Sequence, residues 1–161
     1  MLKATVPQKP PPCHINRAED EKAYKALPLQ ERLDLALREH LSLSERALIL
    51  YREQWMQVRC YFARRADLTT EEIAVLLQDQ DHIIRLCLAK RPDLTPQQIQ
   101  DCVKDRDPNV RYFIARNALL PEDLRAHLQN DGDPLVRRAA AKGPRPPRIA
   151  ARPGQARLIR G

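Results

Sequence analysis

A repeat of 26 residues is the feature that most constrains the fold of this chain. A branched apolar residue followed by arginine recurs at this spacing: Val58-Arg59, Ile84-Arg85, Val110-Arg111 and Val136-Arg137. An alanine followed by a cation recurs in the same register: Ala63-Arg64, Ala89-Lys90, Ala115-Arg116 and Ala141-Lys142. Self-similarity at such a period predicts stacked helical or strand units that bury a shared core.

Each 26-residue unit is expected to contain two short helices. In the first helix, Val58, Tyr61 and Phe62 share one face by their i, i+3, i+4 spacing. The second helix begins at a capping box in three units: Ser42 with Glu45, Thr69 with Glu72, and Thr95 with Gln98. Glycine is rare and aromatic residues make up only 4% of the chain, so we expect an all-α fold with an aliphatic core.

Both ends of the chain depart from the repeat. The 26-residue register extends backwards, so residues 41–53 are expected to form the second helix of a degenerate unit, and residues 23–40 its first helix and a cap. Gly143 and Pro144 are expected to end the last helix. We therefore divide the chain into a disordered Pro-rich arm (1–16), a helical cap with a degenerate repeat (17–57), the repeats (58–142) and a disordered Pro/Arg-rich tail (143–161).

The tail supplies most of the net charge of +7. It contains no acidic residue and five arginines: Arg145, Arg148, Arg152, Arg157 and Arg160. The rest of the chain is nearly neutral. Such a tail can hold nucleic acid or an acidic partner without specificity, or it can act only as a solubilising end. The sequence favours neither interpretation.

The loop between units carries a motif of two aspartates, proline, valine and arginine, at residues 105–111 and 131–137. Over residues 41–142 the sequence resembles HEAT-like α-solenoids, and in particular their short bacterial form, the leucine-rich repeat variant. The resemblance implies a short right-handed α-solenoid of about four repeats. Some members of that family hold an iron–sulfur cluster through cysteines ahead of the repeats. Here only Cys13 precedes them, so no cofactor is expected.

The four cysteines form no CxxC pair. Cys60, Cys87 and Cys102 lie in apolar helical patterns, where we expect small buried side chains in a reducing compartment. A metal site or a disulfide is the alternative.

An acidic residue precedes the arginine of each unit by six positions. The pairs are Glu53/Arg59, Asp79/Arg85, Asp105/Arg111 and Asp131/Arg137. A carboxylate at this place can accept hydrogen bonds from the guanidinium or from the free N–H groups of the next helix. We expect a structural ladder that fixes the angle between units. The alternative is an arginine row that binds an anionic partner.

A second set of cations also follows the repeat. It consists of Arg64, Arg65, Lys90, Arg91, Arg116 and Lys142. Stacked units would bring these side chains onto one surface, which is either an ordinary solvated face or a binding surface for an acidic protein or nucleic acid.

Catalysis is not expected. The sequence contains no HExxH, no GxSxG and no glycine-rich phosphate loop, and none of its four histidines pairs with a nucleophile at triad spacing. A distant likeness to HEAT-like DNA glycosylases implies an aromatic and acidic groove, but Trp55 is the only tryptophan.

We therefore expect a non-catalytic protein–protein interaction module, an adaptor or regulator. The alternative is a nucleic-acid-binding protein that uses the cations and the tail. Neither a secretory signal nor a long apolar stretch is present, so the expected location is the cytoplasm, with no membrane contact.

Overall fold

A computed structural model describes residues 17–145 of the chain. These residues contain ten α-helices and no β-strand, which confirms the all-α fold. The helices are α1 (Arg17–Ala26), α2 (Leu29–Leu37), α3 (Leu43–Arg52), α4 (Met56–Ala63), α5 (Thr70–Leu76), α6 (His82–Ala89), α7 (Pro96–Val103), α8 (Pro108–Ala115), α9 (Glu122–Leu128) and α10 (Pro134–Lys142). The arm expected over residues 1–16, and residues 146–161 of the tail, lie outside the described residues. No helix between residues 17 and 145 is long and apolar enough to cross a membrane.

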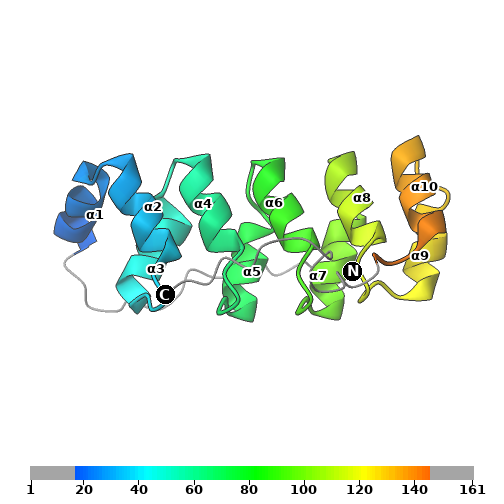
Figure 1. Ribbon diagram of the computed structural model, residues 1–161, viewed down its shortest axis with the longest axis horizontal. Coiled ribbons are helices and arrows are strands. Elements are labelled where there is room, and N and C mark those ends of the chain that lie inside the picture. The colour runs from blue at the N-terminus through cyan, green and yellow to red at the C-terminus, as the bar shows by residue number, and fades with distance from the viewer. Residues whose placement is uncertain (1–16, 146–161) are drawn as a thin grey trace, which may run out of the picture. The chain divides into compact units, whose positions relative to one another are not determined.

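The described residues form two compact units, one that ends at Leu88 and one that begins at Ala89. In the first unit α2 packs against α4, and α3 packs against α1, α4 and α5. Helices α2, α4 and α6 follow one another in one row, with α3 and α5 in the other (Figure 1). This unit is therefore a stack of helix pairs.

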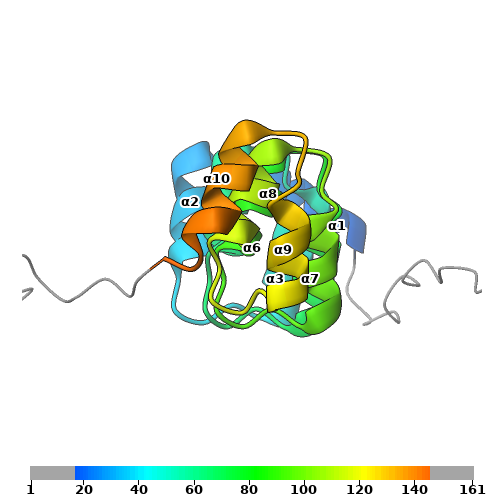
Figure 2. The ribbon, with the colours of Figure 1, turned by 90° about the vertical axis from the view of Figure 1, so that its right-hand side faces the viewer.

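The second unit repeats the same arrangement. Helix α8 packs against α7, α9 and α10, and α9 also contacts α7 and α10. An end-on view shows α8 and α10 in one layer and α7 and α9 in the other (Figure 2). The first helices of successive repeats therefore lie side by side, so residues at the same repeat position become neighbours within a unit.

The helix starts follow the sequence signals. Capping boxes begin α3, α5 and α7 as expected. Asp107 and Asp133 cap α8 and α10, and a proline occupies the first turn of each of these helices. Pro121 is the N-cap of α9 and provides no side-chain cap. The side-chain caps of α3, α5, α7, α8 and α10 satisfy backbone N–H groups that would otherwise have no acceptor.

The N-terminal region differs from the expected first helix and cap over residues 23–40. It contains two separate helices, α1 and α2, and Pro28 is the N-cap of the second. Proline lacks an N–H group and disfavours helical geometry at the residue before it. These two effects explain why the helix is interrupted between Ala26 and Leu29.

The core consists of aliphatic side chains from both rows. The branched apolar residue that precedes the repeated arginine is fully buried in all four units, at Val58, Ile84, Val110 and Val136. The expected i, i+3, i+4 face is only partly correct, because Tyr61 is 41% exposed and the equivalent Cys87 and Phe113 are only half-buried. The buried stripe instead passes through i, i+4 and i+5, for example Val58, Phe62 and Ala63. The i+3 residues therefore lie at the edge of the stack.

Candidate functional site

The acid–arginine ladder joins consecutive turns between helices. Arg111 Nη1 donates to the carbonyl oxygen of Asp105 at 2.8 Å. Its Nε and Nη2 donate to the carboxylate of Asp131 at 2.7 and 3.0 Å. One arginine thus reaches the preceding turn through a backbone oxygen and the following turn through a bidentate ion pair.

This geometry refines the pairing expected from the sequence. The arginine six residues after each aspartate of the ladder donates to the backbone carbonyl of that aspartate, as Arg85 does to Asp79 at 2.6 Å and Arg137 to Asp131 at 2.7 Å. The carboxylate accepts instead from the arginine of the preceding repeat, as in the 2.5 Å bond from Arg59 to Asp79.

The acidic side chains also shape their own turns. Oδ1 of Asp131 accepts the Asp133 N–H at 2.8 Å, and Asp79 and Asp105 bond the residue two positions later in the same way. The hydrogen bonds from Arg111 hold the pKa of Asp131 below its usual value. The side chains of the ladder therefore have a structural role.

Glu53 forms a different rung. Its side chain is fully buried, and it accepts hydrogen bonds from the Tyr24 hydroxyl and from Arg32 at 3.3 Å. Its Oε1 also accepts the N–H groups of Gln54 and Trp55 at 2.7 and 2.8 Å. Burial, together with the Glu53 carboxylate, raises the pKa of Tyr24. Arg32 thus takes the place beside Glu53 that the sequence assigned to Arg59.

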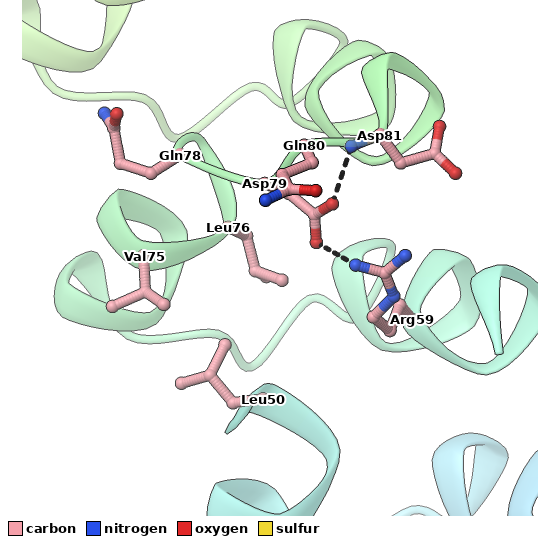
Figure 3. A pocket seen from close by; sticks show the side chains of 8 residues that line it. All are labelled: Leu50, Arg59, Val75, Leu76, Gln78, Asp79, Gln80 and Asp81. Atoms are coloured by element: carbon pink, nitrogen blue, oxygen red, sulfur yellow. Dashed lines mark hydrogen bonds and ion pairs between the residues drawn. The ribbon is translucent and has the colours of Figure 1, made fainter. Parts of the chain in front are cut away.

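An open concavity of about 580 Å³ lies beside the ladder in the first unit. The residues that line it are Leu50, Arg59, Val75, Leu76, Gln78, Asp79, Gln80 and Asp81. Figure 3 shows the Asp79 carboxylate between the Arg59 guanidinium and the N–H of Asp81, so this carboxylate has two donors within the protein. The buried Nε of Arg59 has no hydrogen-bond partner among the described residues. The lining has one cation, Arg59, and two carboxylates, Asp79 and Asp81, so it does not favour an anionic ligand.

A smaller concavity contains Trp55, which is 47% exposed, together with Lys25, Arg32, Arg52 and Gln54. Glu21 accepts from Lys25 at 2.6 Å and from Arg52 at 2.7 Å, and Arg32 pairs with Glu53. Each cation here has a carboxylate partner, so this site has little excess positive charge for an anionic ligand.

Two members of the predicted cationic surface have structural roles. Arg65 donates to the carbonyl oxygens of Ala36, Arg38 and Glu39 at 2.6–3.1 Å and also binds Asp67. Arg91 is only 7% exposed and forms a bidentate pair with Asp93 at 2.6 and 2.8 Å. The expectation that these two arginines contact a partner is therefore not supported by their placement.

The other four cations form no ion pair with a carboxylate in the described part of the chain. They are Arg64, Lys90, Arg116 and Lys142. All four lie at the C-terminal end of a first helix, where a positive charge is favourable beside the negative end of the helix dipole. Their charge therefore remains available to a ligand.

In the second unit two cations, Lys90 and Arg145, lie against Phe113, and Arg116 bonds the residue that follows Lys142. Lys90 Nζ lies 4.0 Å from the centre of the Phe113 ring, and the Arg145 guanidinium carbon lies 5.5 Å from it. Arg116 Nη1 donates to the Gly143 carbonyl at 2.6 Å, and the Arg145 N–H donates to the Arg116 carbonyl at 3.0 Å. We call Lys90, Phe113, Arg116, Lys142 and Arg145 the Phe113 cluster.

Phe113 occupies the repeat position of Tyr61, which the i, i+3, i+4 spacing assigned to the buried face, so the sequence did not indicate Phe113 as a site residue. The sequence indicated Lys90, Arg116, Lys142 and Arg145, but it placed Arg145 in the tail rather than beside the repeats. The remaining tail residues of the prediction, Arg148, Arg152, Arg157 and Arg160, lie outside the described residues. Within residues 17–145, no group of three or more His, Cys, Asp or Glu side chains could hold a metal ion.

No family model matches the sequence, and neither a curated protein nor a solved structure matches it.

Proposed function

We propose that this protein is a non-catalytic binding module that holds an acidic protein segment on the Phe113 cluster. The observation that supports this proposal is the absence of ion pairs at Lys90, Arg116, Lys142 and Arg145 within the described residues, whereas Arg65, Arg91 and Arg111 have carboxylate partners. Cations without a carboxylate partner add local positive charge, which attracts and orients an anionic partner.

The electrostatics of the Phe113 ring favour an added carboxylate. Lys90 and Arg145 both lie against this ring, so two positive charges are held near one another. A carboxylate of a partner would relieve their repulsion and form charge-assisted hydrogen bonds, which are stronger than neutral ones. Because Lys90, Lys142 and Arg145 are exposed, a partner reaches them without rearrangement of the helices.

Nucleic acid is the second candidate ligand, because residues 143–161 contain five arginines and no acidic residue. One feature favours the protein ligand. Single-stranded nucleic acid is usually bound through bases stacked on aromatic faces. In the cluster Lys90 lies against the Phe113 ring at 4.0 Å, which leaves less of the ring for a base.

The test measures binding of a fluorescein-labelled peptide of alternating Glu and Ser. The site variant carries Lys90→Gln, Lys142→Gln and Arg145→Gln, three side chains with no hydrogen bond to the rest of the protein within the described residues. The matched control carries Lys22→Gln, Lys104→Gln and Arg138→Gln, which remove the same charge from exposed positions elsewhere. We expect the site variant to weaken binding about tenfold or more, and the control to weaken it by less than about threefold.

Equal losses in the two variants would show that only net charge matters and would contradict the proposed site. The same titration is run with a labelled single-stranded oligonucleotide, on the full chain and on a chain that ends at Arg145. The proposal would be contradicted if the full chain binds the oligonucleotide but not the acidic peptide, and if oligonucleotide binding is lost when residues 146–161 are removed. In that case nucleic acid would be the ligand.

A further inference from the structure

Two thiols face each other in the first unit. Cys60 lies on α4 and Cys87 lies on α6, and their sulfur atoms are 3.6 Å apart. Both residues are half-buried free cysteines, so a small solute reaches them, while Cys102 is fully buried. Helices α4 and α6 follow one another in the same row (Figure 1).

The repeat explains how this pair arises. Cys60 is equivalent to Leu86, 26 residues later, and Cys87 is equivalent to Tyr61. The cysteines therefore occupy adjacent rather than identical repeat positions. The same two positions carry Tyr112 and Ala139 in the second unit, so the thiol pair belongs to one junction of the repeat and is not part of its general pattern.

We propose that Cys60 and Cys87 are a redox modification site, at which a hydroperoxide converts the two thiols into a reversible disulfide between α4 and α6. A disulfide has a sulfur–sulfur distance of about 2.05 Å, so the two atoms must approach by about 1.5 Å. Both side chains are at the edge of the helix stack, where rotation about their Cα–Cβ bonds meets less packing than in the core.

The surroundings of Cys60 indicate which of the two sulfur atoms reacts first with the hydroperoxide. Burial and the neighbouring Cys87 raise the pKa of Cys60 to about 11, although Arg64 one turn later opposes this shift. Cys60 therefore remains a thiol at neutral pH, so we assign the attack on the peroxide to Cys87 and the second step to Cys60.

The reaction then balances with one hydrogen peroxide molecule. The Cys87 sulfur attacks one peroxide oxygen, the O–O bond breaks, and the departing hydroxide takes a proton to become water. Cys87 is then a sulfenic acid. The Cys60 sulfur attacks the Cys87 sulfur, the S–O bond breaks, and the hydroxyl leaves with the Cys60 proton as a second water. Two thiols are oxidised to one disulfide, and a dithiol reductant reverses the change.

The test uses the full chain with Cys13→Ser, so that the thiol outside the described residues does not compete. After treatment with hydrogen peroxide, intact mass spectrometry should show a loss of about 2 Da, and dithiothreitol should reverse it. Trypsin should release residues 60–64 linked to residues 86–90. Because the cross-link restricts the unfolded chain, the thermal midpoint should rise by about 5–10 °C.

Two single variants test the order of the steps. With Cys60→Ser, dimedone should trap a sulfenic acid on Cys87, whereas Cys87→Ser should give little or no adduct on Cys60. Mass gains of about 16 or 32 Da without the 2 Da loss would overturn the proposal, because they indicate separate oxidation of each thiol. Disulfides between molecules, or with Cys102, would also overturn it.

Discussion

Arg111 holds Asp131 through two parallel hydrogen bonds, although the residues lie 20 positions apart in the sequence. The same guanidinium bonds the carbonyl of Asp105, so one side chain fixes two successive turns. We expect Asp131→Ala to lower the free energy of unfolding by about 1.5–3 kcal/mol, because it removes the charge-assisted bonds and the acceptor for the Asp133 N–H.

Two further substitutions separate these contributions in urea unfolding experiments. Asp131→Asn keeps an acceptor for the Asp133 N–H but removes the charge, so its loss of stability should be intermediate. Asp123→Ala alters an exposed residue of α9 and should change stability by less than about 0.5 kcal/mol. An equal effect of Asp131→Ala and Asp123→Ala would contradict the ladder.

The carboxyl of Asp67 makes stability dependent on acid pH. Hydrogen bonds from Arg65 and then Arg46 lower its pKa to about 2, below the unfolded value of about 3.9. The unfolded chain therefore binds more protons between these values, and the stabilisation is present above about pH 4 and lost as the pH falls toward 2. Asp67→Asn should reduce the slope of unfolding free energy against pH in this window. An unchanged slope would show that the Arg65 pair does not persist in solution.

Arg125 should be among the most sensitive positions in the second unit. It is 5% exposed, and its guanidinium donates to the carbonyls of Ala115, Asn117 and Leu120 at 2.6–3.2 Å. Arg125→Ala leaves these oxygens without that donor, so we expect a loss of about 3 kcal/mol or more. Arg138→Ala, at an exposed position on α10, is the control and should have almost no effect. Chemical denaturation that gives similar midpoints for both variants would argue against this role.

Gly143 forms the backbone turn that brings Arg145 to the Phe113 ring. Its φ of 69° and ψ of −164° lie in a region that is essentially restricted to glycine. Although nothing within 4 Å blocks an added Cβ, Gly143→Ala should cost about 1–3 kcal/mol in backbone strain. It should also weaken peptide binding, because Arg145 would lose its position over Phe113. Pro144→Ala, at the exposed adjacent residue, is the control for both measurements.

The repeat made much of this fold predictable from the sequence. The 26-residue period and the capping boxes indicated the helix pairs, because both depend on local spacing and on nearby side-chain acceptors. Pro28 is a helix-breaking signal in the sequence, and it marks the boundary between α1 and α2 that the expected single helix lacked.

The exceptions lie where the type of side chain changes at a repeat position. Arg125 occupies the repeat position of Ile73 and Ile99, yet it is buried because three carbonyls accept its N–H groups. Asn117 occupies the position of Arg65 and Arg91, and it donates to the carbonyls of Ala89 and Arg91 at 2.9 Å. Periodicity identifies such substitutions but does not identify their acceptors.

The candidate site was only partly predictable. The sequence placed Lys90, Arg116 and Lys142 at equivalent positions, but it could not separate them from Arg65 and Arg91, whose partners are backbone oxygens or nearby carboxylates. The half-exposure of Phe113 depends on which face of α8 is buried, and a helix of eight residues fits more than one apolar face.

Chemical-shift mapping tests the central claim most directly. The ¹⁵N-labelled full chain is titrated with the Glu/Ser peptide at low salt, and the amide signals are followed. We expect the largest shifts at Phe113, Arg116, Gly143 and Arg145, with smaller shifts along α9. Shifts confined to residues 146–161 or to the first unit, with the Phe113 cluster unchanged, would contradict the assignment of the binding surface.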